Sequence, residues 1–252
     1  MNEKKVALIT GATSGIGRAI AYEFAKNGID LVLCGRRQDR LDQVQKDLEK
    51  QTNVHTMTFD VRDKIEVFKA IETLPTSFKK IDILINNAGN AHGLEPIHMG
   101  STDDWDAMID INVKGLLYVS KAIMPQMVER QSGHIINIGS SAGRELYPKG
   151  NVYCASKFSV AAITEGMRID LNPYGIKVCS INPGMVETEF SKVRFKGDAI
   201  ADTIYKGFKP LQPEDIAEIV YFTVSRPSHV NIADVLVFST AQANNTITKK
   251  EL

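Results

Sequence analysis

Residues Val6–Gly17 read VALITGATSGIG, an apolar run that leads directly into three glycines. The apolar run predicts a strand that is buried on both faces, and the residues after it predict a helix. Glycines at such a turn let the backbone approach a pyrophosphate, while the helix N-terminus supplies N–H donors and a positive dipole. The spacing here is G-x-x-x-G-x-G, and glycine turns also open helices for structural reasons alone. The stretch therefore predicts a dinucleotide-binding βα unit, which the rest of the chain must support.

Short apolar runs alternate with longer stretches of helical period along the 252 residues. Apolar strands separated by helices are typical of a parallel sheet that is covered on both faces. We therefore expect one doubly wound, Rossmann-like α/β domain over residues 1–252, with a sheet of about seven strands. The expected strands are Val6–Thr10, Leu31–Cys34, Val54–Phe59, Ile81–Asn86, His134–Ile138, Lys177–Ile181 and Val235–Phe238.

Helical stretches separate the expected strands, and two regions depart from the regular alternation. The expected helices include Gly17–Asn27, Arg40–Gln51, Asp103–Arg130 and Tyr153–Asn172. The stretch Asp103–Arg130 is long for one helix, and we expect Pro125 to bend or end it. The region Pro183–Pro213 breaks the alternation of strands and helices, and long irregular insertions of this kind are usually lids or binding loops. We expect a mobile substrate flap at residues 184–212.

Composition and charge exclude several classes of function. The 30 Lys and Arg residues balance the 30 Asp and Glu residues, so no single-sign field attracts nucleic acid or an anionic membrane. No apolar run is long enough to span a bilayer, and the apolar run at the N-terminus is too short for a signal peptide. The three cysteines lie far apart, and neither they nor the histidines have metal-ligand spacing. We expect a soluble cytoplasmic protein without a metal.

The residues after the second expected strand predict which dinucleotide is bound. Folds that select NAD carry an acid at this point, which binds the ribose 2′-hydroxyl. Here Gly35 is followed by Arg36 and Arg37, and guanidinium groups pair well with phosphate. The sequence therefore favours NADP, whose 2′-phosphate would lie against these two cations. The alternative is a solvated charge run that opens the next helix.

A tyrosine and a lysine at positions i and i+4 form the candidate catalytic pair, Tyr153 and Lys157. The pairs Tyr22/Lys26 and Tyr205/Lys209 have the same spacing, so the spacing alone proves nothing. What distinguishes Tyr153 is Ser140, which lies thirteen residues upstream, just past an expected strand.

This combination suits hydride transfer between an alcohol carbon and a nicotinamide, which needs an acid/base for the hydroxyl proton. A phenol with a pKa of about 10 is a poor base at neutral pH. A neighbouring ammonium is expected to lower that pKa, and a serine hydroxyl can hold the substrate oxygen.

With these motifs in this order, the chain resembles the short-chain dehydrogenase/reductase family over essentially its whole length. The resemblance implies Tyr153 as acid/base, Lys157 as its pKa modifier and ribose ligand, Ser140 as the substrate-orienting hydroxyl, and Asn112 as the holder of a relay water. It also implies a cofactor site that includes Tyr153 and Lys157 and is otherwise formed by Gly11, Thr13, Ser14, Gly15, Ile16, Gly17, Arg36, Arg37, Asp60, Val61, Asn87, Ala88, Gly89, Pro183, Gly184, Val186 and Thr188. Asp60 is also a common turn or N-cap residue. Ser14 departs from the Lys or Arg that many NADP-preferring members carry, so specificity would depend on Arg36 and Arg37 alone.

Residues Phe190–Asp198 carry three cations and two aromatic rings, as a lid that closes on a carboxylate would. Together with Trp105, residues 150–153, 213–215 and 229–232, this stretch resembles the NADP-dependent 3-hydroxy acid dehydrogenases. These oxidise L-allo-threonine or L-serine and reduce malonic semialdehyde to 3-hydroxypropionate. We therefore assign a substrate carboxylate to Arg194, with Lys192 as second choice and Arg144 as third. The alternative for the flap is a solvated basic loop.

Two other functions compete with this interpretation. One is a 3-oxoacyl-carrier-protein reductase or broad carbonyl reductase, although the C-terminal stretch Val235–Gln242 lacks the glycine-rich turn usual in those reductases. The other is a non-catalytic NADP-sensing module, which typically loses the Tyr or the Lys. The resemblance further implies a homotetramer built on the Asp103–Arg130 and Tyr153–Asn172 helices.

Overall fold

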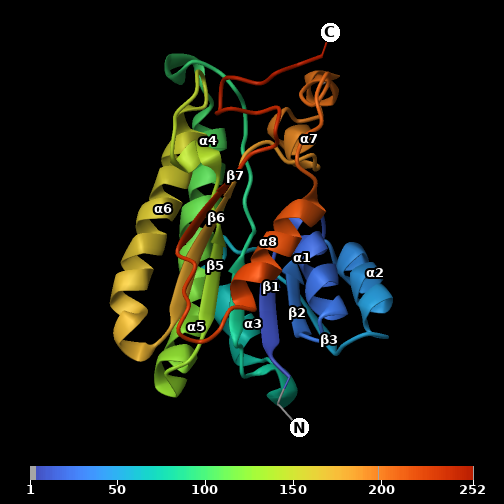
Figure 1. Cartoon of the computed structure of the whole chain (residues 1–252), viewed down its shortest axis with the longest axis vertical. Coiled ribbons are helices and arrows are strands. Elements are labelled where there is room, and N and C mark those ends of the chain that lie inside the picture. Colours follow the sequence, from blue (N-terminus) through green and yellow to red (C-terminus); the bar gives the residue numbers. More distant parts are fainter. Residues whose placement is uncertain (1–3, 198, 252) are drawn as a thin grey trace.

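The computed structural model describes residues 4–197 and 199–251 and contains a seven-stranded, wholly parallel sheet. The strand order is β3-β2-β1-β4-β5-β6-β7 (Figure 1). The strands are β1 Val6–Thr10, β2 Asp30–Gly35, β3 Val54–Thr58, β4 Ile83–Asn86, β5 His134–Ile138, β6 Lys177–Pro183 and β7 Asp234–Val237. All seven expected strands are present, and the predicted fold class is confirmed.

Helices cover both faces of the sheet (Figure 1). Side chains alternate along β1, so Ala7 and Ile9 pack on one face while Val6 and Leu8 pack on the other. The first face is covered by α1 Gly15–Lys26, α2 Gln38–Leu48 and α8 Pro213–Val224, and the second by α3 Lys64–Glu72, α5 Leu116–Arg130 and α6 Asn151–Leu171. Because both faces are buried at the centre of the sheet, a central strand such as β1 is fully buried and apolar up to its final threonine, rather than alternating with polar residues.

Shorter helical segments connect these elements. They are α4 Thr102–Ile109, α7 Phe190–Arg194, the π-helical turn Asp110–Gly115 and the 3-10 turns Thr76–Phe78, Ile97–Met99, Ser141–Gly143, Asn172–Tyr174 and Ala199–Thr203. Among the described residues, no helix is both long and apolar enough to cross a membrane.

The expected helix Asp103–Arg130 is interrupted, although not by its proline. The π-helical turn at Asp110–Gly115 separates α4 from α5, and α5 continues through Pro125 to Arg130. Of the two effects expected of Pro125, to bend or to end the helix, the second is wrong. A π turn inserts one extra residue into the helix and often occurs at functional sites. Here it contains the buried Asn112.

The strand order places a crevice at the carboxyl ends of β1 and β4. The chain leaves β1 toward β2 on one side, and later returns to β4 on the other side. Connections that diverge in this way leave an opening above the sheet where α/β proteins bind their ligands. The predicted site residues follow these strand ends, and α7 lies above them (Figure 1).

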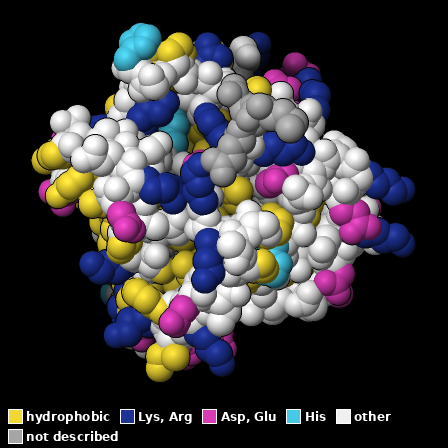
Figure 2. Space-filling model, turned by 90° about the horizontal axis from the view of Figure 1, so that it is seen from below, with side chains coloured by type: hydrophobic (Ala, Val, Ile, Leu, Met, Phe, Trp, Pro, Cys, Tyr) yellow, Lys and Arg dark blue, Asp and Glu magenta, His cyan; other side chains and the backbone are white. Residues whose placement is uncertain are grey.

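His134, the first residue of β5, is buried at the opposite end of the sheet. Neither ring nitrogen has a hydrogen-bond partner among the described residues. The amino-terminal end of the sheet carries several Lys and Arg side chains (Figure 2). Burial, with repulsion from Lys177 and Lys5, lowers the pKa of His134 to about 3. The imidazole is therefore neutral in the folded protein.

This lowered pKa predicts acid sensitivity. Between pH 6.5 and about 3 the unfolded chain binds a proton at His134 that the folded chain does not. Stability is therefore complete above pH 6.5 and falls below it, by about 1.4 kcal/mol per pH unit from this residue. We expect His134→Phe, measured by urea unfolding from pH 7 to pH 4, to reduce that slope. The exposed His98, changed to Gln, serves as control; an unchanged slope in His134→Phe would contradict the assignment.

Candidate active site

A cavity of about 590 Å³ opens at the carboxyl ends of the strands. Its walls come from the loops that follow β1 to β6, from α6, from the segment around α7, and from Gln242 and Asn245 near the C-terminus. All predicted cofactor and catalytic residues line it except Gly17 and Asn112, which lie directly behind its wall.

The glycine-rich loop is held against the end of β4. The Thr10 hydroxyl accepts hydrogen bonds from the backbone N–H groups of Asn87 and Ala88, both at 3.0 Å. The Asn87 side chain donates in return to the carbonyl of Thr10 at 2.9 Å and to that of Gly11 at 3.3 Å. A Cβ atom on Gly17 would lie 2.5 Å from the carbonyl oxygen of Gly11. Gly17 therefore serves close packing of the helix on the strand, as the last glycine of such loops does.

Cations line the cavity beyond this loop. The guanidinium of Arg37 donates to Thr13 Oγ1 at 2.8 and 3.2 Å, and to Ser14 Oγ at 2.8 Å. Arg36 is more exposed and lies 3.6 Å from the carboxylate of Asp60. The predicted cation pair is thus at the cavity rim, and Arg37 is the better fixed of the two. Its position against Thr13 and Ser14 supports a site for a phosphate group.

The candidate catalytic residues come together on α6 and the loop after β5. Tyr153 and Lys157 lie one turn apart on α6, and each is 8% exposed. The hydroxyl of Ser140 forms a hydrogen bond with the phenol of Tyr153 and accepts one from the N–H of Ala142 at 3.1 Å. The Lys157 ammonium donates to the carbonyl of Ile138 at 3.0 Å. The alternative pair Tyr22/Lys26 lies outside the cavity, where Tyr22 donates to Asp47.

Burial dominates the acid–base properties of this pair. It raises the pKa of the Tyr153 phenol well above its ordinary value, and the hydrogen bond from Ser140 and the charge of Arg194 offset this only in part. Burial also lowers the pKa of Lys157 to about 8. The Lys157 ammonium donates to the Ile138 carbonyl, and its predicted role as the modifier of the Tyr153 pKa stays a prediction. Because burial raises its pKa, the Tyr153 phenol is protonated at neutral pH.

Asn112 fixes the loop that follows β4. Its side-chain oxygen accepts from the N–H of Asn90 at 2.8 Å, and its amide donates to the Asn90 carbonyl at 2.8 Å and to Ser156 at 3.0 Å. The extra residue of the π turn turns this side chain inward from the helix. The amide oxygen also lies close to Gly89, where a Cβ atom would be 3.0 Å away.

The residues that follow the end of β6 at Pro183 form another wall of the cavity. Gly184 donates its N–H to Val237 at 2.7 Å, and the N–H of Met185 donates to Gln242 at 2.8 Å. The predicted residues Pro183, Gly184, Val186 and Thr188 all line the cavity. Gln242 was not predicted, since an isolated glutamine near the C-terminus carries no sequence pattern.

Of the three candidate anion-binding cations, only Arg194 lines the cavity. Its guanidinium lies 5.6 Å from the centre of the Tyr153 ring and donates to the Tyr147 hydroxyl at 2.8 Å and to the Gly93 carbonyl at 3.0 Å. Lys192 is exposed, and Arg144 is paired with Asp234. Both are outside the cavity lining, so these second and third choices are not supported by geometry. Asp198, the last residue of the basic stretch, lies outside the described residues.

Comparison with known proteins identifies the class. The family model for short chain dehydrogenases matches residues 5–199. This chain belongs to the short-chain dehydrogenase family, as its motifs predicted, and the predicted enzyme class is confirmed.

Individual relatives are similar over almost the whole chain. Sulfoacetaldehyde reductase 2 of Chromohalobacter salexigens is 44% identical over 94% of this chain and 95% of its own length. The NADP-dependent 3-hydroxy acid dehydrogenase of Salmonella typhi is 45% identical over 94% of this chain and 96% of its own. A solved structure of the closed form of serine dehydrogenase complexed with NADP+ superposes with a TM-score of 0.92 and 41% identity, covering 98% of this chain and all of that one.

The geometry predicts that Tyr153 is essential and that Tyr22 is not. We expect Tyr153→Phe to lower kcat by about a thousandfold, within the range of general acid–base catalysis. Tyr22→Phe, which alters a tyrosine with the same i+4 lysine, is the matched control and is expected to keep its activity. Thermal unfolding of both variants would check that the fold is intact. Substantial turnover by Tyr153→Phe would refute the assignment.

Proposed function

We propose that this protein is an NADP-dependent oxidoreductase that transfers hydride between NADP(H) and a small 3-hydroxy acid or its 3-oxo acid. The observation that carries the proposal is the Arg194 guanidinium beside the buried Tyr153 phenol, inside the same cavity as the glycine-rich loop. A cation at this distance can hold the anionic end of a short substrate while the alcohol carbon lies near Tyr153. The substrates we favour are L-allo-threonine, L-serine and 3-hydroxypropionate or malonic semialdehyde.

The cofactor site fits NADP on its own residues. Gly11 to Gly17 form the pyrophosphate loop, Arg36 and Arg37 offer guanidinium donors, and Pro183 to Thr188 line the far wall. When bound, NADPH supplies the hydride. The N–H groups at the start of α1 would hold the pyrophosphate, and Arg37 would hold the 2′-phosphate.

The protein's own residues would supply the proton and stabilise the charge that develops on the substrate oxygen. In the reductive direction Tyr153 donates its proton to the substrate oxygen, and burial keeps the phenol protonated until that step. Ser140 donates a hydrogen bond to the same oxygen. Lys157 provides a positive charge close to Tyr153 while the pH is below about 8. Asn112 holds the loop on which Gly89 and Asn90 lie.

Arg194 would bind the anionic group at the end of the substrate. One relative is named a 3-hydroxy acid dehydrogenase and another a sulfoacetaldehyde reductase, so carboxylate and sulfonate both come into question. Both anions accept hydrogen bonds from a guanidinium. Arg194 already donates to Tyr147 and Gly93, which leaves further N–H donors for one oxyanion. We favour the carboxylate and treat the sulfonate as the second candidate.

The first experiment follows absorbance at 340 nm with purified protein. NADP⁺ and NAD⁺ are each paired with L-serine, L-allo-threonine, 3-hydroxypropionate, 2-hydroxyethanesulfonate and an uncharged secondary alcohol. We expect NADP⁺-dependent oxidation of the carboxylated alcohols. Turnover of the uncharged alcohol alone would favour a broad carbonyl reductase or a carrier-protein reductase, and turnover of the sulfonate alone would favour the second candidate. No turnover with any pair would favour a cofactor-sensing module.

Arg194 is the substrate residue to test. We expect Arg194→Met to raise KM for the carboxylated alcohol about 10- to 100-fold, because a charge-assisted hydrogen bond is lost. KM for an uncharged alcohol should change little. Lys206→Met, an exposed cation in the same segment, is the control. If Lys192→Met rather than Arg194→Met raises KM, the substrate anion binds to Lys192 instead.

We further propose that residues 184–212 act as the substrate flap, because described residues of this segment, among them Phe190, Arg194 and Tyr205, line the cavity. A homotetramer is proposed on the outer faces of α5 and α6, where Leu117, Phe158 and Ile169 are 40%, 39% and 65% exposed. Large exposed apolar side chains of this kind often mark subunit contacts. We propose the cytoplasm as the location of the protein.

A further inference from the structure

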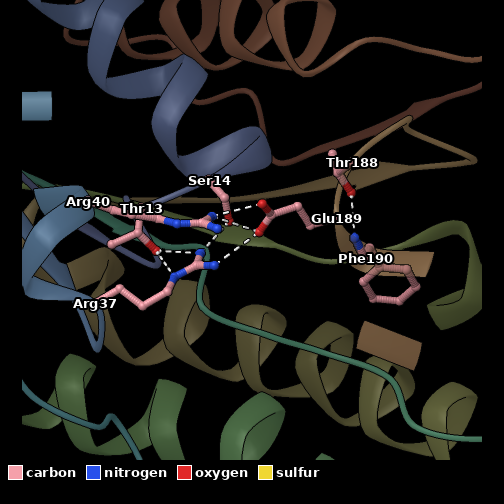
Figure 3. A network of polar contacts seen from close by, with 7 residues as sticks. All are labelled: Thr13, Ser14, Arg37, Arg40, Thr188, Glu189 and Phe190. Carbon is pink, nitrogen blue, oxygen red and sulfur yellow. Dashed lines mark hydrogen bonds and ion pairs between the residues drawn. The ribbon is translucent and has the colours of Figure 1, made fainter. Parts of the chain in front are cut away.

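Glu189, the residue immediately before α7, forms ion pairs with Arg37 and Arg40 at the start of α2 (Figure 3). Its Oε2 accepts from Arg37 Nη1 at 3.0 Å, and both its oxygens accept from Arg40 Nη1, at 2.8 and 2.9 Å. These partners are about 150 residues away in sequence, so only the fold brings them together. The contact joins the segment around α7 to the adenosine end of the cofactor site.

Arg37 is one of the two arginines that would hold the 2′-phosphate, and it is better fixed than Arg36. Arg37 uses Nε and Nη2 on the hydroxyls of Thr13 and Ser14, and Nη1 on Glu189 (Figure 3). Phosphate binds a guanidinium best through two parallel N–H donors. These contacts use four of the five N–H donors of Arg37, and the remaining N–H on Nη1 has no free parallel neighbour. A phosphate that takes two parallel donors must therefore displace either a hydroxyl of the glycine-rich loop or the Glu189 carboxylate. Glu189 and a 2′-phosphate thus compete for the Nη1–Nη2 edge of the guanidinium.

The negative charge of Glu189 strengthens its competition with a 2′-phosphate for Arg37. Hydrogen bonds from Arg40 and then from Arg37 hold the pKa of the Glu189 carboxyl below its ordinary range, so the group is anionic at neutral pH. An anionic carboxylate repels an incoming phosphate as well as occupying its donor. Arg40 can keep Glu189 paired once Arg37 is released, since it already contacts both carboxylate oxygens.

We propose that Glu189 is a specificity-determining residue whose carboxylate competes with the cofactor's 2′-phosphate for Arg37 and so reduces the preference for NADP over NAD. The proposal builds on the NADP dependence proposed above. Glu189 brings a carboxylate to Arg37, two residues after Gly35 and next to the position at which dinucleotide folds that select NAD carry an acid. In this chain that position holds Arg36, and the nearby acid is Glu189, which lies immediately before α7.

A supporting role for Glu189 would have the opposite effect. If its carboxylate only held Arg37 in place for the phosphate, removing the negative charge would weaken phosphate binding. Competition requires that removing the charge strengthens it. The sign of the change therefore separates the two roles, whatever its size.

The decisive measurement is calorimetric binding of adenosine 2′,5′-bisphosphate and adenosine 5′-monophosphate, two probes that differ only in the 2′-phosphate. We expect Glu189→Gln to bind the bisphosphate about fivefold more tightly, since a half-exposed ion pair is worth up to about 1 kcal/mol. Affinity for the monophosphate should not change, because glutamine still accepts a hydrogen bond from a 2′-hydroxyl. Unchanged or weaker binding of the bisphosphate would overturn the proposal.

The chain offers a matched control in Glu187, two residues earlier. Its carboxylate accepts from Gln212 at 3.0 Å and does not line the cavity. Glu187→Gln is expected to leave the affinities for both probes unchanged, and a gain equal to that of Glu189→Gln would reduce the effect to net charge and overturn the proposal. Neither probe contains nicotinamide, so the result is independent of substrate turnover. A failed search for hydroxy acid substrates would refute the proposed function without altering this measurement.

Discussion

The site depends on the reciprocal hydrogen bonding between the end of β1 and the loop after β4. The Thr10 hydroxyl receives two backbone N–H groups, and the Asn87 amide returns hydrogen bonds to Thr10 and Gly11. These bonds satisfy polar groups in a region with little access to water, where an unpaired donor is costly. They also fix the glycine-rich loop at the point where the strand order diverges. The cavity opens directly above this junction.

Burial on α6 gives the candidate catalytic pair its acid–base properties. Tyr153 and Lys157 are both almost inaccessible, so burial pushes the phenol's pKa up and the ammonium's pKa down, each toward its neutral form. A neutral phenol is the appropriate proton donor for reduction of a carbonyl. The polar partners at hand are few and specific: the Ser140 hydroxyl for the phenol and the Ile138 carbonyl for the ammonium. The site thus combines an apolar environment with a small number of directed hydrogen bonds, as small-molecule sites commonly do.

The fold and most of the site could be predicted because their signals are local. Apolar runs such as Val6–Thr10, glycine spacing, and a tyrosine one turn from a lysine all lie within short stretches of sequence. Three features could not be predicted. The π turn around Asn112 has no distinctive composition, and Pro125 is accommodated within α5 instead of ending it. Glu189 reads as an ordinary surface acid, since its partners Arg37 and Arg40 are remote in sequence.

Helix α7 has one ligand-facing residue at each end. Glu189 precedes it on the adenosine side, and Arg194 ends it beside Tyr153, with its backbone carbonyl accepting from the N–H of Gly93 at 3.1 Å. The helix between them is only about 7.5 Å long, since it has five residues. One short element therefore sets the separation between the carboxylate that contacts Arg37 and the cation that lies beside Tyr153. An insertion or deletion within α7 would change the adenosine end and the Tyr153 end of the cavity together.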